Sequence, residues 1–155
     1  VHLMIVNPDK YIRRFAEAGA SYISFHLEAA DDAGKDASEY IALARECGVK
    51  VGLAIDPDVP VERLFPYIEQ VDFFLIMSVF AGFGGQKFIP ESIERVAALR
   101  AEMERRGAVK DIEVDGGVSA SNAKALAEAG ATMLVAGSSV FKAEDPACAI
   151  AEMRV

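Results

Sequence analysis

Residues 15–23, Phe15-Ala-Glu-Ala-Gly-Ala-Ser-Tyr-Ile23, resemble residues 126–134, Leu126-Ala-Glu-Ala-Gly-Ala-Thr-Met-Leu134, and the two segments share Ala-Glu-Ala-Gly-Ala. Each copy has the pattern of a helix end, a glycine that stops the helix, and the start of an apolar strand. A repeated helix-to-strand unit predicts a fold in which helices and strands alternate along the chain.

The remaining sequence alternates in the same way. Apolar, strand-like runs lie at 1–6, 21–26, 50–55, 72–78, 111–115 and 132–136, and helical patterns separate them. Strands joined by helices pair in parallel through right-handed crossovers, and strands that are apolar throughout are covered on both faces. We therefore predict one α/β domain over residues 1–155, because no shift in composition marks a linker.

The glycines distinguish two architectures that such units can build. They follow the last three predicted strands, as Gly82, Gly84 and Gly85, as Gly116 and Gly117, and as Gly137. An open dinucleotide-binding sheet places its phosphate glycines after its first strand, whereas a TIM barrel builds its phosphate site from the loops after its last strands. The sequence therefore predicts a (β/α)8 TIM barrel, of which six βα units are present.

The length of the sequence and its first residues indicate which strands of the barrel are present. A TIM barrel has eight strands in about 250 residues, and this sequence has 155 and opens inside a strand-like run, Val1-His-Leu-Met4. We expect the present strands to be strands 3 to 8, with the first two βα units outside the sequence.

Composition excludes several kinds of partner. The chain is 52% hydrophobic and carries a net charge of −8, which disfavours nucleic acid and anionic membrane surfaces. No apolar run approaches the roughly 20 residues of a membrane span. Cys47 and Cys148 lie far apart in helix-like contexts, and we expect buried, reduced thiols in a cytoplasmic protein.

The glycine turns are the first candidate binding elements. Backbone N–H groups in such turns can approach a phosphate closely, and three turns at one rim of a barrel would converge on a phosphorylated ligand. Each turn taken singly is equally explained as a tight connection. Their shared position favours the ligand.

Four further side chains, and two methionines, are candidates for chemistry. Asp115 ends a strand directly before Gly116, where catalytic carboxylates occur in barrels, although it could also cap the following helix. His2 lies in an apolar strand and could equally be a core histidine. His26 and Glu28 follow another strand and could bind a divalent metal or act as an acid/base pair. Met4 and Met77 are expected to fill the core.

Several motifs together resemble the ribulose-phosphate 3-epimerase family. They are His2-Leu-Met4, His26-x-Glu28-Ala29, Leu75-Ile-Met-Ser-Val79, Gly82-Phe-Gly-Gly-Gln-Lys-Phe-Ile-Pro90, Glu113-Val-Asp-Gly-Gly117 and Val135-Ala-Gly-Ser138. The resemblance runs through the whole chain in the family's order. It implies a TIM barrel that inverts C3 of ribulose 5-phosphate to give xylulose 5-phosphate with a divalent metal (Zn, Fe, Mn or Co).

The resemblance also implies roles for individual residues. Asp115 would be one of two aspartates that move the proton at C3, and Asp115 and His2 would be metal ligands. Met4 and Met77 would lie against the planar enediolate. The substrate and its phosphate would be held by Gly82, Phe83, Gly84, Gly85, Gly116, Gly117, Gly137 and Ser138, with His2 also beside the substrate. A small sugar phosphate is the implied partner, and we expect a homo-oligomer.

The chain also departs from the family pattern. Phe80-Ala81 stands where the family has Asn-Pro, so we expect a differently shaped loop over the substrate. The resemblance places the other catalytic aspartate and two more metal ligands in the absent strands. Two alternatives therefore remain: a phosphate-binding partial barrel without activity, and an epimerase that acts on a hexulose 6-phosphate.

Overall fold

The computed structural model describes residues 1–80, 82 and 85–154. Its strands are β1 (His2–Leu3), β2 (Tyr22–His26), β3 (Lys50–Ile55), β4 (Phe73–Met77), β5 (Asp111–Asp115) and β6 (Met133–Val135). Its helices are α1 (Asp9–Glu17), α2 (Leu27–Asp32), α3 (Ala37–Glu46), the 3-10 helix η1 (Val61–Tyr67), α4 (Ser92–Arg105), α5 (Ala120–Ala129), α6 (Ser138–Phe141) and α7 (Pro146–Met153).

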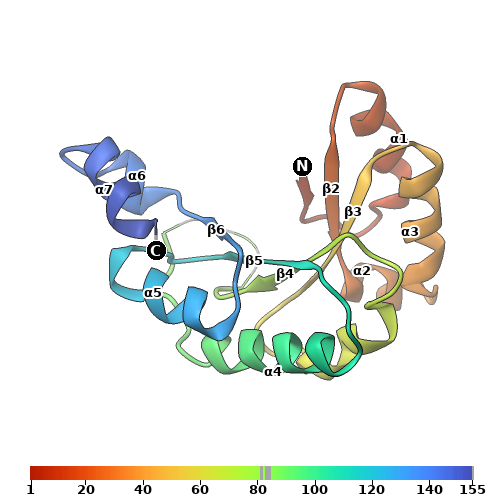
Figure 1. Cartoon of the computed structure of the whole chain (residues 1–155). Helices are drawn as coiled ribbons and strands as arrows, with labels where there is room; N and C mark the ends of the chain where they lie inside the picture. Colours follow the sequence, from red (N-terminus) through yellow and green to blue (C-terminus); the bar gives the residue numbers. More distant parts are fainter. Residues whose placement is uncertain (81, 83–84, 155) are drawn as a thin grey trace.

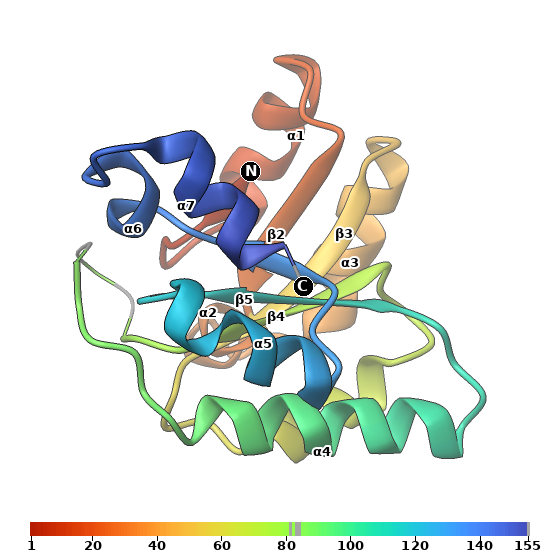
Figure 2. The same cartoon turned by 60° about the vertical axis from the view of Figure 1, so that its left-hand side comes forward.

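The strands form one sheet in their sequence order, β1 to β6, and every neighbouring pair is parallel. The sheet curls, with α1 and α3 outside β2 and β3, and α4 and α5 outside β4 and β5 (Figure 1). Helix α4 packs against both η1 and α5, and α7 packs against α5 and α6 (Figure 2). Parallel strands that follow one another around a curve are the arrangement expected of a barrel wall.

Side chains alternate between the two faces of the sheet, as they must in extended strands. On the outer face, Phe25, Leu53 and Ile76 belong to the main apolar core between the sheet and the helices. On the inner face, Ala54, Leu75, Met77 and Val79 form a separate small cluster. The polar side chains of the strands also lie on the inner face, so the candidate functional residues are on the concave side of the sheet.

The repeated sequence unit has the same local structure at both places. Gly19 and Gly130 both adopt positive φ, at +100° and +112°; Gly19 follows the C-cap residue of α1, and Gly130 is the C-cap of α5. Such a conformation ends a helix at low cost only when the residue is glycine. Asp36 caps the start of α3, because its Oδ1 accepts a hydrogen bond from the Ser38 N–H at 2.8 Å.

Three local expectations were wrong. The strand predicted at 1–6 pairs only over His2–Leu3, since Met4 to Val6 diverge from the neighbouring strand and are exposed. Helix α2 follows β2 without an intervening turn, and no separate helix was predicted at this place. Cys148 is exposed and Cys47 partly buried, although both are free thiols as expected.

No helix in the described ranges is both long and apolar enough to cross a membrane.

Candidate active site

A cavity of about 270 Å³ lies at the carboxyl ends of β4, β5 and β6. The predicted site residues that line it are Met4, Met77, Gly82, Gly85, Asp115, Gly116, Gly117, Gly137 and Ser138. It is completed by residues that the sequence did not single out, among them Phe80, Gln86 and Ser139. The structure thus gathers residues from four separate parts of the chain around one space. Ala81, Phe83 and Gly84 lie outside the described residues.

Asp115 provides the carboxylate of this cavity. It is half-buried at the end of β5, and burial raises the pKa of its carboxyl above the ordinary 3.8. Among the described residues, no side chain or N–H group forms a hydrogen bond or ion pair with its carboxylate oxygens. A half-buried carboxylate without a partner is costly unless a cation or ligand compensates it. Asp115 is therefore suited to bind a cation or to exchange a proton.

The alternative role of Asp115 as a helix cap is not seen. Helix α5 is capped by Ser119 and Asn122, whose side chain accepts a hydrogen bond from the Ser119 N–H at 2.9 Å. Because this cap satisfies the start of α5, the Asp115 side chain has no structural task there.

The turn after Asp115 brings backbone into the cavity. Gly116 and Gly117 both have positive φ, at +123° and +63°. A Cβ on Gly116 would approach the backbone N of Val79 to 2.8 Å, and one on Gly117 would approach that of Phe88 to 2.6 Å. Glycine is required here for packing as well as for conformation. The consequence is a wall of the cavity made of exposed peptide groups.

His2 does not line the cavity, although Met4, two residues later, does. Its Nδ1 lies 2.9 Å from the Ser24 hydroxyl and its Nε2 lies 3.2 Å from Nε2 of His26. Burial, together with the nearby His26 and the N-terminal amine, lowers the pKa of His2 to about 4. The His2 imidazole is therefore neutral at physiological pH, as a metal-binding histidine must be.

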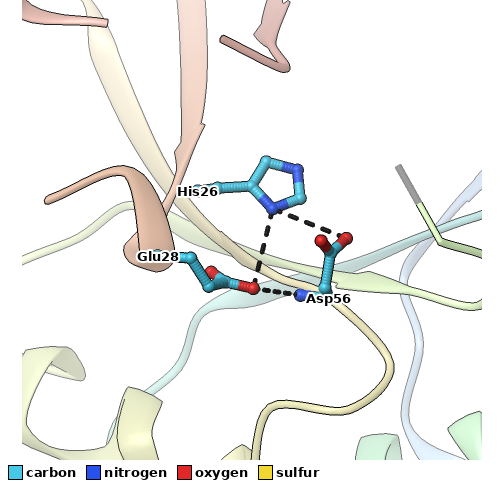
Figure 3. A group of neighbouring side chains, drawn as sticks. All are labelled: His26, Glu28 and Asp56. Atoms are coloured by element: carbon cyan, nitrogen blue, oxygen red, sulfur yellow. Dashed lines mark hydrogen bonds and ion pairs between the residues drawn. The ribbon is translucent and has the colours of Figure 1, made fainter. Parts of the chain in front are cut away.

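His26 also belongs to a second polar group, together with Glu28 and Asp56 (Figure 3). His26 Nδ1 is 3.8 Å from Glu28 Oε1 and 3.7 Å from Asp56 Oδ1. Glu28 Oε1 also accepts a hydrogen bond from the Asp56 backbone N–H at 2.6 Å. One possible ligand atom from each of these three residues lies within 4.8 Å of the other two. The sequence paired His26 with Glu28 but missed Asp56, which could have been found as the acidic residue directly after the strand at 50–55.

The Glu28 carboxyl is held in its ionised form. Burial raises its pKa, but the His26 imidazole and backbone N–H groups of Asp56 and of Glu28 itself outweigh burial and lower the pKa below 4.5. The net effect places a negative charge beside His26 at neutral pH.

Arg95 on α4 fixes the ends of two strands and was not expected from the sequence. Its guanidinium donates to the carbonyls of Met77 at 3.2 Å, Asp56 at 2.7 Å and Val59 at 3.0 Å. These three carbonyls follow or end β3 and β4, so one side chain positions both the floor of the cavity at Met77 and the Asp56 loop.

Comparison with known proteins identifies the family of this chain. A model of the ribulose-phosphate 3 epimerase family matches residues 1–141. The chain belongs to the ribulose-phosphate 3-epimerase family. It is 46% identical over 154 residues to the ribulose-phosphate 3-epimerase of Synechocystis, 41% over 153 residues to that of Schizosaccharomyces pombe, and 42% over 156 residues to the cytoplasmic isoform of Oryza sativa.

Each alignment with these family members covers 99% of this chain and 64–66% of the relative, so the chain spans just under two thirds of their length. All the predicted site residues fall within the part that matches the family model.

Solved structures support the predicted architecture. A 3-hexulose-6-phosphate synthase has a TM-score of 0.68 at 20% identity and covers 94% of this chain and 66% of its own. KGPDC from Streptococcus mutans has a TM-score of 0.67 at 13% identity, covering 94% and 64%. Identities this low establish the fold only. The similarity to these two structures confirms that this epimerase-family chain forms six parallel strands of a TIM-type barrel.

Proposed function

We propose that this chain contributes the phosphate rim and one of the two catalytic carboxylates of an enzyme that inverts C3 of D-ribulose 5-phosphate to give D-xylulose 5-phosphate. The observation that carries the proposal is the half-buried Asp115 carboxylate, which has no hydrogen-bond or ion-pair partner among the described residues. It lies in a cavity walled by the Gly116–Gly117 turn, in a chain of the ribulose-phosphate 3-epimerase family.

Asp115 acts on the proton at C3. The C3 proton is acidified by the adjacent ketone, and a carboxylate whose pKa is raised by burial is a stronger base for it than an exposed aspartate. Inversion needs a second acid/base on the opposite face of C3. Asp115 supplies the acid/base group on one face of C3 only.

The other walls of the cavity suit the charge that develops. Met4 and Met77 present polarisable sulfur to a planar enediolate and keep water from it. Gly117, Gly137 and Ser138 bring main-chain N–H groups to the same cavity, where they would bind the phosphate oxygens. Phe83 and Gly84 belong to the same proposal through the family motif.

The residues present are suited to a divalent metal. His2 offers a neutral imidazole and Asp115 an uncompensated carboxylate, which are the nitrogen and oxygen donors that Zn, Fe, Mn and Co accept. We propose these two as ligands, with the metal supplying Lewis-acid stabilisation of the enediolate oxygens. A cytoplasmic location belongs to the same proposal, supported by the relative that is named a cytoplasmic isoform.

Exchange of the C3 hydrogen tests the role of Asp115 directly. The chain is incubated with D-ribulose 5-phosphate and Zn²⁺ in D₂O, and deuterium at C3 is followed by NMR. We expect incorporation by the unaltered chain and at least a hundredfold slower incorporation by Asp115→Asn. Equal rates in the two proteins would refute the assignment. A parallel assay with a hexulose 6-phosphate separates the two substrate classes.

A further inference from the structure

Two imidazoles meet between β1 and β2. His2 Nε2 and His26 Nε2 are 3.2 Å apart, which is hydrogen-bonding distance, and the ring centroids are 5.0 Å apart. The His26 residue is 6% exposed, so water cannot replace this contact. One of the two Nε2 atoms must carry the proton that the other accepts.

The surroundings of His26 decide which nitrogen of its ring is protonated. Its Nδ1 faces Glu28 Oε1 at 3.8 Å and Asp56 Oδ1 at 3.7 Å (Figure 3). An unprotonated Nδ1 would direct its lone pair at two carboxylates, whereas an Nδ1–H directs positive charge at them. The electrostatic attraction of these two carboxylates therefore favours the His26 proton on Nδ1 and leaves Nε2 as an acceptor.

The tautomer of His2 follows from that of His26. Because His26 Nε2 accepts, His2 Nε2 must donate, and a neutral His2 then has an unprotonated Nδ1. That atom lies 2.9 Å from the Ser24 hydroxyl, which can donate to it. Ser24 is buried, so the hydroxyl has few other partners.

We propose that Glu28 and Asp56, acting through His26, hold His2 in the tautomer that is protonated on Nε2 and unprotonated on Nδ1, where a metal would replace the Ser24 hydroxyl as the partner of the lone pair. In metal sites, hydrogen bonds of this kind to the distal nitrogen of a histidine ligand fix the ring and raise its basicity. The tautomer stands on the contacts alone. Its use for binding metal through Nδ1 rests on the proposed function. His26, Glu28 and Asp56 are thus positioning residues.

A metal within the His26–Glu28–Asp56 group is the competing explanation of the same distances. Glu28 Oε1 accepts a 2.6 Å hydrogen bond from the Asp56 N–H, whereas Glu28 Oε2 is buried without a hydrogen-bond partner in the described part of the chain and stays open to a cation. Against a metal in this group, the Arg95 guanidinium donates a hydrogen bond to the Asp56 carbonyl at 2.7 Å, so a positive charge already lies close to Glu28 and Asp56.

The tautomers can be read directly, since His2 and His26 are the only histidines in the sequence. Nitrogen-15 NMR of the metal-free chain distinguishes protonated from unprotonated ring nitrogens by chemical shift and by coupling to ring protons. We expect His2 protonated on Nε2 and His26 on Nδ1. The double variant Glu28→Gln/Asp56→Asn should convert His2 to a mixture of tautomers, whereas the exposed control Glu69→Gln should not.

Two variants of His26 separate positioning from packing. His26→Ala removes the acceptor, and we expect His2 to lose its single tautomer and Zn²⁺ affinity, measured calorimetrically, to fall about 10- to 100-fold. His26→Gln restores an acceptor oxygen near the same place and should recover most of both. Urea unfolding of each variant shows whether the fold is intact.

The outcomes discriminate between the explanations. His2 protonated on Nδ1, or His26 protonated on both nitrogens, would overturn the proposal, as would a His2 tautomer that is unchanged in His26→Ala. Zn²⁺ that shifts His26 Nδ1 rather than His2 Nδ1 would place the metal in the competing group. If the tautomers are as inferred but Zn²⁺ shifts neither ring, the positioning stands and the metal role of His2 in the proposed function fails.

Discussion

The Ser78 hydroxyl lies 2.6 Å from the backbone carbonyl oxygen of Gly116 and 3.0 Å from that of Asp115. Ser78 follows β4 and is fully buried, so this one side chain ties the end of β4 to the turn that carries the catalytic candidate. The Ser78 N–H also donates to the Asp115 carbonyl at 2.8 Å.

Replacing Ser78 by Ala should therefore lower the free energy of unfolding by about 1–3 kcal/mol, because it leaves the Gly116 carbonyl buried without its donor. Urea unfolding measures the change. The exposed Ser121→Ala is a matched control and should stay within about 0.5 kcal/mol of the unaltered chain. A Ser78→Ala variant as stable as that control would contradict the role given to this hydroxyl.

Gly117 and Gly137 should respond differently to the same substitution. Gly117→Ala puts a Cβ at φ +63° and against the Phe88 backbone, so we expect a loss of about 1–3 kcal/mol or more. Gly137 has φ −102° and nothing within 4 Å of its Cβ position. Gly137→Ala should fold normally, which makes it the cleaner probe of phosphate binding. Thermal unfolding of both variants checks this contrast.

Gly52 makes room for the ring of Phe73 on the neighbouring strand. A Cβ at Gly52 would overlap that ring, with Cε1 as near as 2.7 Å. Gly52→Ala should cost about 1–3 kcal/mol of unfolding free energy. The double variant Gly52→Ala/Phe73→Leu should lose less than the sum of the two single variants, since the smaller side chain relieves the overlap. Strict additivity in denaturant unfolding would argue against this contact.

Stability in acid should depend on Glu28. Its folded-state pKa lies below 4.5, so ionised Glu28 stabilises the fold above that value and this contribution is lost as pH falls through the folded-state pKa. Unfolding free energies measured at a series of pH values should fall in acid for the unaltered chain. The fall should be shallower for Glu28→Gln and unchanged for Glu69→Gln. Parallel curves for all three proteins would exclude this contribution.

The alternation of strands and helices was predictable because its signals are local. The helix-ending role of Gly19 and Gly130 could be predicted from the residues next to them in the sequence, and both glycines have the expected positive φ. Helix α2 was missed because it begins directly after His26 without a side-chain cap, so no boundary is visible in the sequence. Strand β1 is shorter than its apolar run because hydrophobicity does not determine where pairing stops.

The cavity was predictable for a different reason. Residues that end parallel strands meet at one rim, so Met77, Asp115 and Gly137 could be grouped from the strand assignments alone. The contacts behind the rim could not be predicted from the sequence. Arg95 lies near the start of a helix with ordinary composition, and only the packing of α4 shows that it reaches the carbonyls of Met77 and Asp56. The His2–His26 pair likewise depends on the register between β1 and β2.

The alternation of side chains across the curved sheet has a consequence for how such a chain can diversify. Phe25, Leu53 and Ile76 hold the helices to the outer face, whereas Met77 and Asp115 on the inner face touch the cavity. Neighbouring positions in one strand therefore have different requirements. One side chain must pack against the helices, and the next must suit the ligand in the cavity. New specificities can therefore arise by changing every second residue, while the scaffold is inherited unaltered.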